Sequence, residues 1–198
     1  MSKLMLPAAI SNRHVHLSRE DLETLFGKGF ELTKSKDLSQ PGQFAANEQV
    51  DLIGPKRTIK GVRILGPVRK TTQVEISITD AFTLGVPPVV RNSGDLANTP
   101  GLKIVGPAGE IALDKGCIVA ARHIHMHTSD AEKFGVKDKD VVSVRTEGPR
   151  TVVFENVLAR VHPDYALEMH VDTDEGNSAC KKHLHRIGAF SYKQNLYI

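Results

Sequence analysis

Two pairs of histidines stand out as residues that could do chemistry: His14 with His16, and His123 with His125. In a β-strand, residues two apart point to the same face, so each pair presents two imidazoles side by side. Imidazole nitrogen suits zinc, and catalytic zinc sites commonly have three protein ligands and one open position. One isolated His-x-His is more often a structural or exposed pair. Two copies, each preceded by an arginine, favour two metal sites.

Each pair needs a third ligand, and two strand-like segments offer one. Residues 72–79 and 167–172 alternate apolar and polar side chains, which places Glu75 and His170 on the polar faces of their segments. Both are therefore candidate metal ligands. The alternative for Glu75 is a solvated strand carboxylate.

Arg69 is a candidate for binding an anion. If the strand that carries Glu75 begins as early as Val68, alternation places Arg69 on the face of Glu75. A planar guanidinium beside a metal site could clamp phosphate between two positive centres. The alternative is a solvated surface arginine. Arg13 and Arg122, which precede the two histidine pairs, are interpreted as residues that orient neighbouring carboxylates or close a barrel.

The four remaining histidines are weaker ligand candidates. His127 lies at an expected helix start, and His162 precedes a proline in a turn. A third His-x-His, His183 with His185, follows two lysines and has no copy elsewhere. This third pair is interpreted as a solvated or anion-contacting segment.

The elements around the motifs show an internal repeat, because residues 13–17 recur as residues 122–126. Each copy leads into a short polar segment with the pattern of a helix that ends at a glycine. Two copies of one supersecondary unit predict two similar subdomains. The expected first and last residues around these helices are Ser18 with Gly27, and Thr128 with Gly135.

Outside those helices the sequence predicts short strands separated by turns, four of which contain Gly-Pro. Strands at roughly ten-residue spacing are typical of barrels and sandwiches, and a duplicated unit favours two small barrels. The predicted class is therefore mainly β. The expected strands are residues 50–53, 58–68, 72–79, 102–105, 111–113, 118–121, 141–145, 151–161 and 167–172.

Composition excludes several classes of protein. The net charge of +3 comes from interspersed charges without a basic stripe, which argues against a nucleic-acid partner. Two cysteines, Cys117 and Cys180, cannot build a disulfide framework and are interpreted as ordinary thiols of an intracellular protein. No apolar run reaches the ~20 residues of a membrane span, and the first ten residues are too short for a signal peptide. We therefore expect a soluble, unprocessed, cytoplasmic protein without a membrane partner.

The motifs of several common enzyme classes are missing. The sequence contains no GxSxG nucleophile elbow, Walker A loop, GxGxxG fingerprint or HExxH helix. These absences argue against the common serine-hydrolase, nucleotide-binding and metalloprotease interpretations.

Five motifs in order resemble the zinc-dependent phosphate propanoyltransferase (phosphotransacylase) family of bacterial microcompartments, some of whose members take part in propanediol degradation. The similarity extends over nearly the whole chain, and five motifs are far more specific than one His-x-His. They are residues 11–16, 66–75, 91–94, 121–125, and 169–172 with 176–177.

The resemblance implies two interlocked small β-barrels capped by short helices, with the active site in a cleft between them. One barrel would comprise residues 13–120, and the other residues 3–12 plus 121–190. Two zinc ions per chain would lie in the cleft. The resemblance implies His14, His16 and Glu75 as ligands of one zinc, His123, His125 and His170 as ligands of the other, Arg69 as the catalytic phosphate-binding residue, and Ser93 and Asn177 as further substrate-binding residues.

The implied reaction converts acyl-CoA and phosphate into acyl phosphate and coenzyme A, and the reverse. Propanoyl-CoA and acetyl-CoA are the expected short-chain substrates. Two alternatives stay open, a zinc hydrolase acting on an ester or phosphate ester and a structural metal protein. The sequence also leaves open homo-oligomer formation and an association with microcompartment shell or lumen enzymes. Only ten residues precede the first motif, so no N-terminal encapsulation extension is evident.

Overall fold

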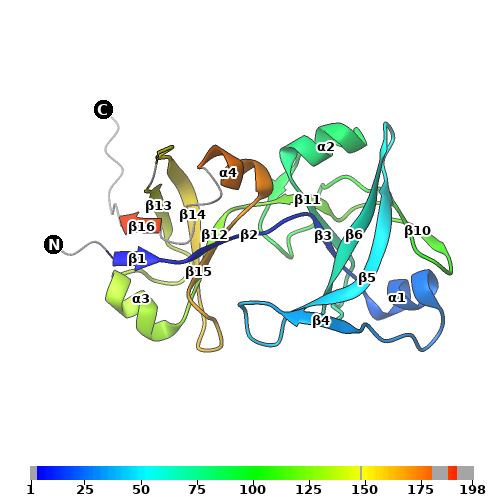
Figure 1. Ribbon diagram of the computed structural model, residues 1–198, viewed down its shortest axis with the longest axis horizontal. Coiled ribbons are helices and arrows are strands. Elements are labelled where there is room, and N and C mark those ends of the chain that lie inside the picture. Colours follow the sequence, from blue (N-terminus) through cyan, green and yellow to red (C-terminus); the bar gives the residue numbers. More distant parts are fainter. Residues whose placement is uncertain (1–3, 148, 180–186, 191–198) are drawn as a thin grey trace. The chain divides into compact units, whose positions relative to one another are not determined.

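The computed structural model describes residues 4–147, 149–179 and 187–190. The chain divides into two compact units (Figure 1): Asn12–Ala120, called the first unit here, and Met1–Ser11 with Ala121–Ile198, called the second unit. Each unit is built on one curled sheet with short helices. The prediction of a mainly β fold is confirmed.

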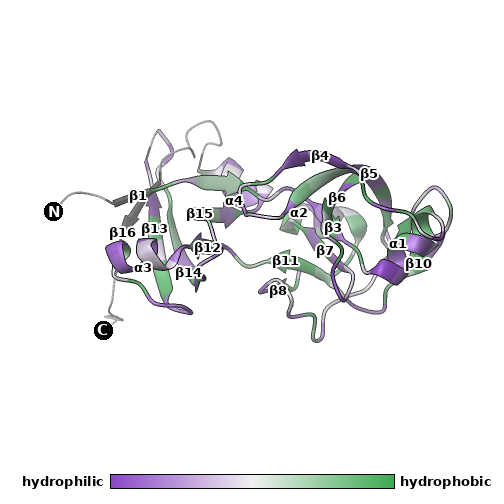
Figure 2. Cartoon of the chain, turned by 90° about the horizontal axis from the view of Figure 1, so that it is seen from below, coloured by the Kyte–Doolittle hydropathy of each residue, from purple (hydrophilic) through white to green (hydrophobic). Residues whose placement is uncertain are grey.

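The first unit holds a sheet in the order β10-β9-β5-β6-β3-β7-β11-β8, with β4 added on β5. Figure 2 shows β11 as hydrophobic and the edge strand β4 as hydrophilic, in keeping with the exposure of every residue of β4. The strands are β3 (His14–His16), β4 (Lys34–Asp37), β5 (Phe44–Ile53), β6 (Thr58–Gly66), β7 (Gln73–Ile76), β8 (Val90–Arg91), β9 (Lys103–Val105), β10 (Glu110–Ala112) and β11 (Cys117–Ala120).

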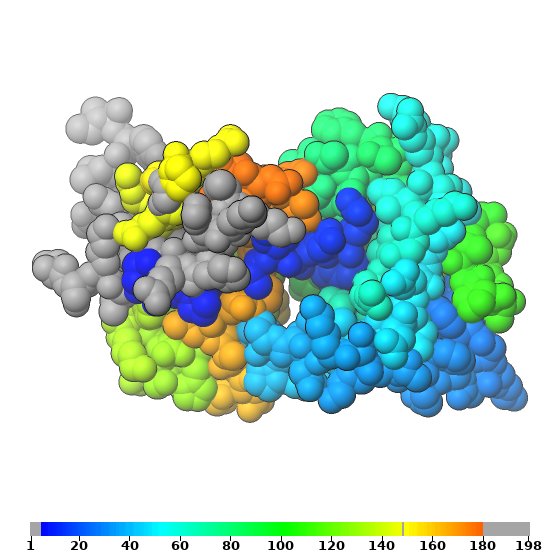
Figure 3. All heavy atoms as spheres, in the orientation of Figure 1, coloured from blue at the N-terminus to red at the C-terminus, as the bar shows by residue number. Residues whose placement is uncertain are grey.

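The second unit holds a sheet in the order β1-β16-β13-β14-β12-β15-β2. Figure 3 shows the blue N-terminal segment beside orange residues of this unit, in agreement with the pairing of β2 with β15. The strands are β1 (Leu4–Leu6), β2 (Ala8–Ile10), β12 (His123–Met126), β13 (Val141–Thr146), β14 (Val153–Val161), β15 (Glu168–Val171) and β16 (Ile187–Phe190).

The two sheets repeat the same pairings in the same register. β3 pairs antiparallel with β7, with His14 opposite Glu75, and β12 pairs antiparallel with β15, with His123 opposite His170. β3 also lies parallel to β6, as β12 lies parallel to β14. The duplication seen in the histidine motifs therefore extends to the strands that carry the third ligands.

The strands that precede the motifs are exchanged between the units. β2 precedes the first motif but pairs with β15 of the second unit, where Ala9 lies opposite His170. β11 precedes the second motif but pairs with β7 of the first unit, where Ile118 lies opposite Glu75. Each motif strand is therefore preceded in the chain by a strand that pairs in the sheet of the other unit.

A helix follows each of the four ligand-bearing strands, β3, β7, β12 and β15. The helices after the histidine motifs are α1 (Arg19–Phe26), capped by Ser18, and α3 (Thr128–Phe134). The predicted cap Thr128 is wrong: the N-cap of α3 is His127, whose ring accepts a hydrogen bond from the Ser129 amide. Two further helices were missed at the sequence level, α2 (Ile78–Leu84) and α4 (Thr173–Ser178).

Each unit has its own hydrophobic core of mainly aliphatic side chains. In the first core, Val15 lies fully buried between the two histidines of β3, and Ile124 does the same in β12 of the second core. One face of each motif strand is therefore fixed in a core, which directs the histidines to the other face. No helix within the described parts of the chain is long and apolar enough to cross a membrane.

Candidate active site

The first cluster brings together His14, His16 and Glu75, all three of them buried. The Nε2 atoms of the two histidines lie 3.2 Å apart, and His14 Nε2 lies 3.5 Å from Glu75 Oε2. His14 Nδ1 donates to the Asn12 carbonyl at 2.8 Å, and His16 Nδ1 donates to the Leu65 carbonyl at 3.3 Å. Because a carbonyl can only accept, both Nδ1 atoms donate, and in the neutral rings both Nε2 atoms carry lone pairs that face each other. A cation between them would satisfy both lone pairs. The hydrogen bonds from Nδ1 to backbone carbonyls are the usual second-shell contacts of metal-binding histidines.

The protonation states in this cluster suit a metal. Burial, together with His14 and Arg69, lowers the pKa of His16 to about 3, so that its imidazole is neutral at pH 7. Burial raises the pKa of Glu75, but the nearby His14 and His16 with the Ser93 hydroxyl and Arg69 outweigh burial and lower this pKa to about 2. The cluster therefore offers a neutral His16 imidazole and a Glu75 carboxylate, the forms that bind zinc.

A hydrogen-bonded network connects Glu75 to Arg69. Gln73 Nε2 donates to Glu75 Oε1 at 2.6 Å and to Ser93 Oγ at 2.9 Å. Ser93 Oγ donates to the same Glu75 oxygen at 3.0 Å and accepts from Arg69 Nη1 at 3.3 Å. The loop that carries Ser93 is held by the Gly94 amide, which donates to Gln73 Oε1 at 2.8 Å. The hydroxyl of Ser93 thus bridges the guanidinium of Arg69 and the carboxylate of Glu75, a candidate metal ligand.

Arg69 reaches this position by a different route from the predicted one. β7 begins at Gln73, so the expected strand from Val68 is wrong and strand alternation does not place the arginine. Arg69 instead pairs with Ser18 in an isolated bridge, and its amide donates to the Leu17 carbonyl at 2.8 Å.

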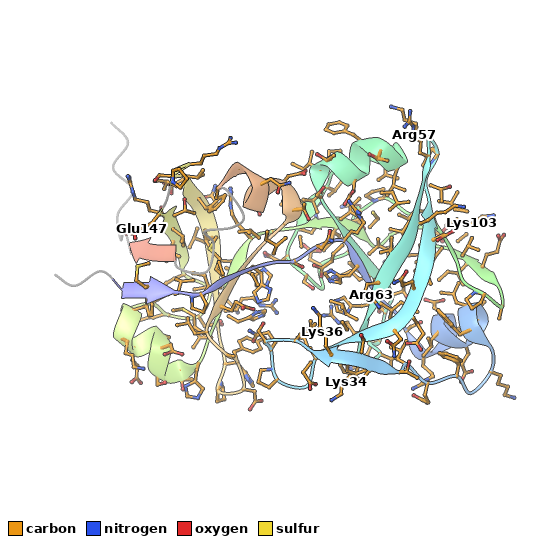
Figure 4. The ribbon with its side chains drawn as sticks, in the orientation of Figure 1. Lys34, Lys36, Arg57, Arg63, Lys103 and Glu147 are labelled. Atoms are coloured by element: carbon orange, nitrogen blue, oxygen red, sulfur yellow. The ribbon has the colours of Figure 1, made fainter. Side chains whose placement is uncertain are left out.

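The sheet beside this cluster carries another arginine. Arg63 of β6, labelled in Figure 4, lies opposite His14 in the parallel ladder and donates to the Ala46 carbonyl at 2.7 Å.

The second cluster brings together His123, His125 and His170. The rings of His123 and His170 are stacked with centroids 5.2 Å apart, and His125 meets both rings edge-on. His123 Nδ1 donates to the Ala121 carbonyl at 2.9 Å, as His14 does to the Asn12 carbonyl. In the neutral ring, this hydrogen bond places the lone pair of His123 on Nε2.

Each motif arginine holds a carboxylate at the start of the helix after the third-ligand strand. Arg13 forms a two-point ion pair with Asp80, at 2.9 and 2.7 Å, and Arg122 pairs with Glu175 at 3.1 Å. Asp80 and Glu175 complete the capping boxes of α2 and α4. The interpretation that these arginines orient carboxylates agrees with this geometry, whereas their partners were not identified from the sequence.

The other candidate residues are not members of the two clusters, and three of them lie outside the described residues. Asn177 is an exposed residue of α4, and His162 is exposed and close to Asp164. Cys117 is buried, and burial raises the pKa of its thiol to about 12, so it is unreactive at neutral pH. Cys180, His183 and His185 lie outside the described residues.

Comparison with known proteins decides the family. The sequence model of phosphate propanoyltransferase matches residues 7–182 of the chain. The chain belongs to the phosphate propanoyltransferase family.

Relatives with the same name are closely similar over most of both chains. The phosphate propanoyltransferase of Thermotoga maritima is 65% identical over 171 residues, which cover 86% of this chain and 81% of the relative. Those of Rhodopseudomonas palustris and Clostridioides difficile are 53% and 54% identical, over 87% and 85% of this chain and 76% and 80% of their own lengths. The prediction that the protein is a transferase enzyme is confirmed.

Proposed function

We propose that this member of the phosphate propanoyltransferase family is a zinc-dependent enzyme that interconverts a short-chain acyl-CoA and phosphate with acyl phosphate and coenzyme A. Propanoyl-CoA is the first acyl donor to test because the relatives carry that name, with acetyl-CoA as the shorter alternative. The observation that carries the metal requirement is the pair of facing Nε2 lone pairs in the first cluster, 3.2 Å apart beside a carboxylate.

Two zinc ions per chain are proposed. His14, His16 and Glu75 would hold one, and His123, His125 and His170 would hold the other. When bound, zinc supplies Lewis-acid stabilisation of negative charge that develops on the reacting oxygens or on the departing thiolate.

Arg69 is the proposed phosphate-binding residue. Its guanidinium can hold two phosphate oxygens in one plane, which limits rotation of the phosphate and keeps a third oxygen free to attack the thioester carbon. The Ser93 hydroxyl, which accepts from Arg69 and donates to Glu75, fixes the distance between the phosphate-binding group and the ligand cluster. Phosphate attacks as a dianion or monoanion, so the reaction requires no covalent acyl-enzyme. Asn177 is proposed as a further substrate-binding residue from the family resemblance alone.

The test is the release of free thiol from propanoyl-CoA or acetyl-CoA by the purified protein, with and without phosphate. We expect thiol release only when phosphate is present, loss of turnover after chelation, and recovery on addition of zinc. Equal thiol release without phosphate would indicate the zinc hydrolase instead. No thiol release in either condition, from protein with its metal bound, would contradict the proposal.

A further inference from the structure

Gln73 is a buried polar residue at the start of β7. Its side chain is 2% exposed, and it lies opposite His16 in the ladder of β7 with β3. Residues two apart on one strand share a face, so Gln73 lies beside Glu75 on the face that carries the histidines. A carboxamide buried in this place is costly unless its polar atoms are hydrogen-bonded.

Both polar atoms of the Gln73 carboxamide are hydrogen-bonded. Its Oε1 accepts from the Gly94 amide at 2.8 Å, and its Nε2 donates to Glu75 Oε1 at 2.6 Å and to Ser93 Oγ at 2.9 Å. Because the Gly94 amide can only donate, the carboxamide oxygen must face Gly94, and the nitrogen then faces Glu75 and Ser93. The backbone of the loop therefore fixes the orientation of the carboxamide.

This orientation determines how the carboxylate of Glu75 is presented. Gln73 and Ser93 both donate to its Oε1, at 2.6 and 3.0 Å. Its Oε2 lies 3.5 Å from His14 Nε2, whereas Oε1 lies 4.0 Å from His16 Nε2. A carboxylate with two donors on one oxygen is restrained from rotating, and its other oxygen stays directed at the histidine pair.

The same carboxamide holds the loop that contacts Arg69. Ser93 Oγ donates its single proton to Glu75, so it can only accept from Gln73 Nε2 and from Arg69 Nη1, at 2.9 and 3.3 Å. The next residue of the loop, Gly94, donates to Gln73 Oε1. One buried side chain is thus bonded both to a candidate metal ligand and to the loop against which the proposed phosphate-binding arginine rests.

We propose that Gln73 is a positioning residue of the reaction. It directs Glu75 Oε2 toward the ion, and it holds the Ser93–Gly94 loop so that the guanidinium of Arg69 keeps a constant distance from that ion. A glutamine that only stabilised the fold would affect unfolding and leave zinc affinity and phosphate binding unchanged. The proposal rests on the zinc-dependent function proposed above.

The test compares Gln73→Met with wild type in two measurements. Methionine is a flexible side chain without an N–H or O–H donor, so it fills the space without making these hydrogen bonds. In a zinc titration of the metal-free, full-length protein against a chromophoric chelator, wild type should bind two ions, and the variant should bind one of them about 10-fold or more weakly. In the zinc-loaded enzyme, the KM for phosphate should rise about 10-fold, while the KM for acyl-CoA changes little.

Two further variants separate positioning from stability. Thr146→Val is the matched control, because Thr146 is a buried polar residue of the second unit whose hydroxyl is bonded to the Val152 backbone. It should lower the unfolding temperature without changing zinc affinity or either KM. Gln73→Asn keeps the carboxamide on a shorter side chain that cannot reach all three partners, so it should show the same two shifts as Gln73→Met. Thermal unfolding of each metal-free protein verifies that the variants are folded.

A Glu75→Ala background shows whether Gln73 acts on zinc through Glu75. Adding Gln73→Met to Glu75→Ala should weaken zinc binding by far less than Gln73→Met does in wild type. Fully additive losses in this double variant, or wild-type zinc affinity and phosphate KM in a folded Gln73 variant, would overturn the role of Gln73. A wild-type protein that binds no zinc, or that releases no thiol with phosphate present, would instead overturn the proposed function itself.

Discussion

The two ligand clusters, His14, His16 and Glu75 (the first block) and His123, His125 and His170 (the second block), have the same backbone construction and different surroundings. Both use an Arg-His-x-His strand, an antiparallel partner in the same register, and a helix whose capping carboxylate holds the arginine. In the first block, all three ligands are buried, and Glu75 is joined to Arg69 through Ser93. In the second, His123 and His170 are half-buried, and His125 packs edge-on against Tyr165 with centroids 4.5 Å apart.

This difference indicates that duplication kept the scaffold while the chemistry of the two sites diverged. The described contacts connect Arg69, the proposed phosphate-binding residue, to the first block, whereas the second block is lined by rings and is more exposed. We infer that the first block serves the phosphate and that the second has more tolerance for change. The following predictions test that asymmetry.

The largest expected effect is the loss of a first-block ligand. His14→Ala should lower kcat/KM about 1000-fold, at the upper end of losses caused by removing a preorganised electrostatic group. His123→Ala should lower it less, by about 100-fold. Steady-state kinetics with zinc content measured on the same samples would check the order. Equal rates and full metal content in both variants would mean that the ligand assignment is wrong.

Arg69→Lys probes the arginine that the described contacts connect to the first block. Lysine keeps the positive charge but cannot hold two phosphate oxygens in one plane, so kcat/KM for phosphate should fall about 100-fold. The KM for acyl-CoA and the zinc content should change little. Arg63→Lys is a matched control on a neighbouring strand. Near-normal phosphate kinetics in Arg69→Lys would assign Arg69 to the solvated surface and remove the asymmetry.

The ion pairs Arg13–Asp80 and Arg122–Glu175 should differ less between the two units. Breaking them should change the free energy of unfolding and not the rate of the reaction. Asp80 is 5% exposed and holds Arg13 at two points, so Asp80→Asn should lower the free energy of unfolding by about 2 kcal/mol, below the cost of breaking a fully buried pair because Arg13 is partly exposed.

Glu175→Gln should cost at most about 1 kcal/mol, since both partners of its ion pair are partly exposed. Urea unfolding of the two variants and wild type measures both losses. If Glu175→Gln lost more unfolding free energy than Asp80→Asn, the expected order of the two ion pairs would be wrong.

Much of the fold and of both clusters could be predicted from the sequence, because a period of two directly reports the shared face of a strand. That rule identified His14 with His16 and assigned Glu75 and His170 to polar faces. It failed for Arg69, which lies before β7 and is placed by loop contacts.

The remaining features depend on register between distant strands, which no local pattern contains. Gln73 lies opposite His16, and Glu168 lies opposite His125, only because β7 and β15 pair with the motif strands in this register. The missed helix α2 begins within a segment whose Ile78 continues an apparent strand alternation. Its start signal was the pair Ser77 and Asp80, a capping box that could have been recognised in the sequence.

The proposed zinc-dependent function requires one metal ion in each block. Anomalous diffraction at the zinc absorption edge, from crystals of the full-length protein grown with zinc, would locate the ions directly. We predict two peaks per chain, one among His14, His16 and Glu75 and one among His123, His125 and His170. A structure with bound substrate but with no zinc peak in either block would contradict the account.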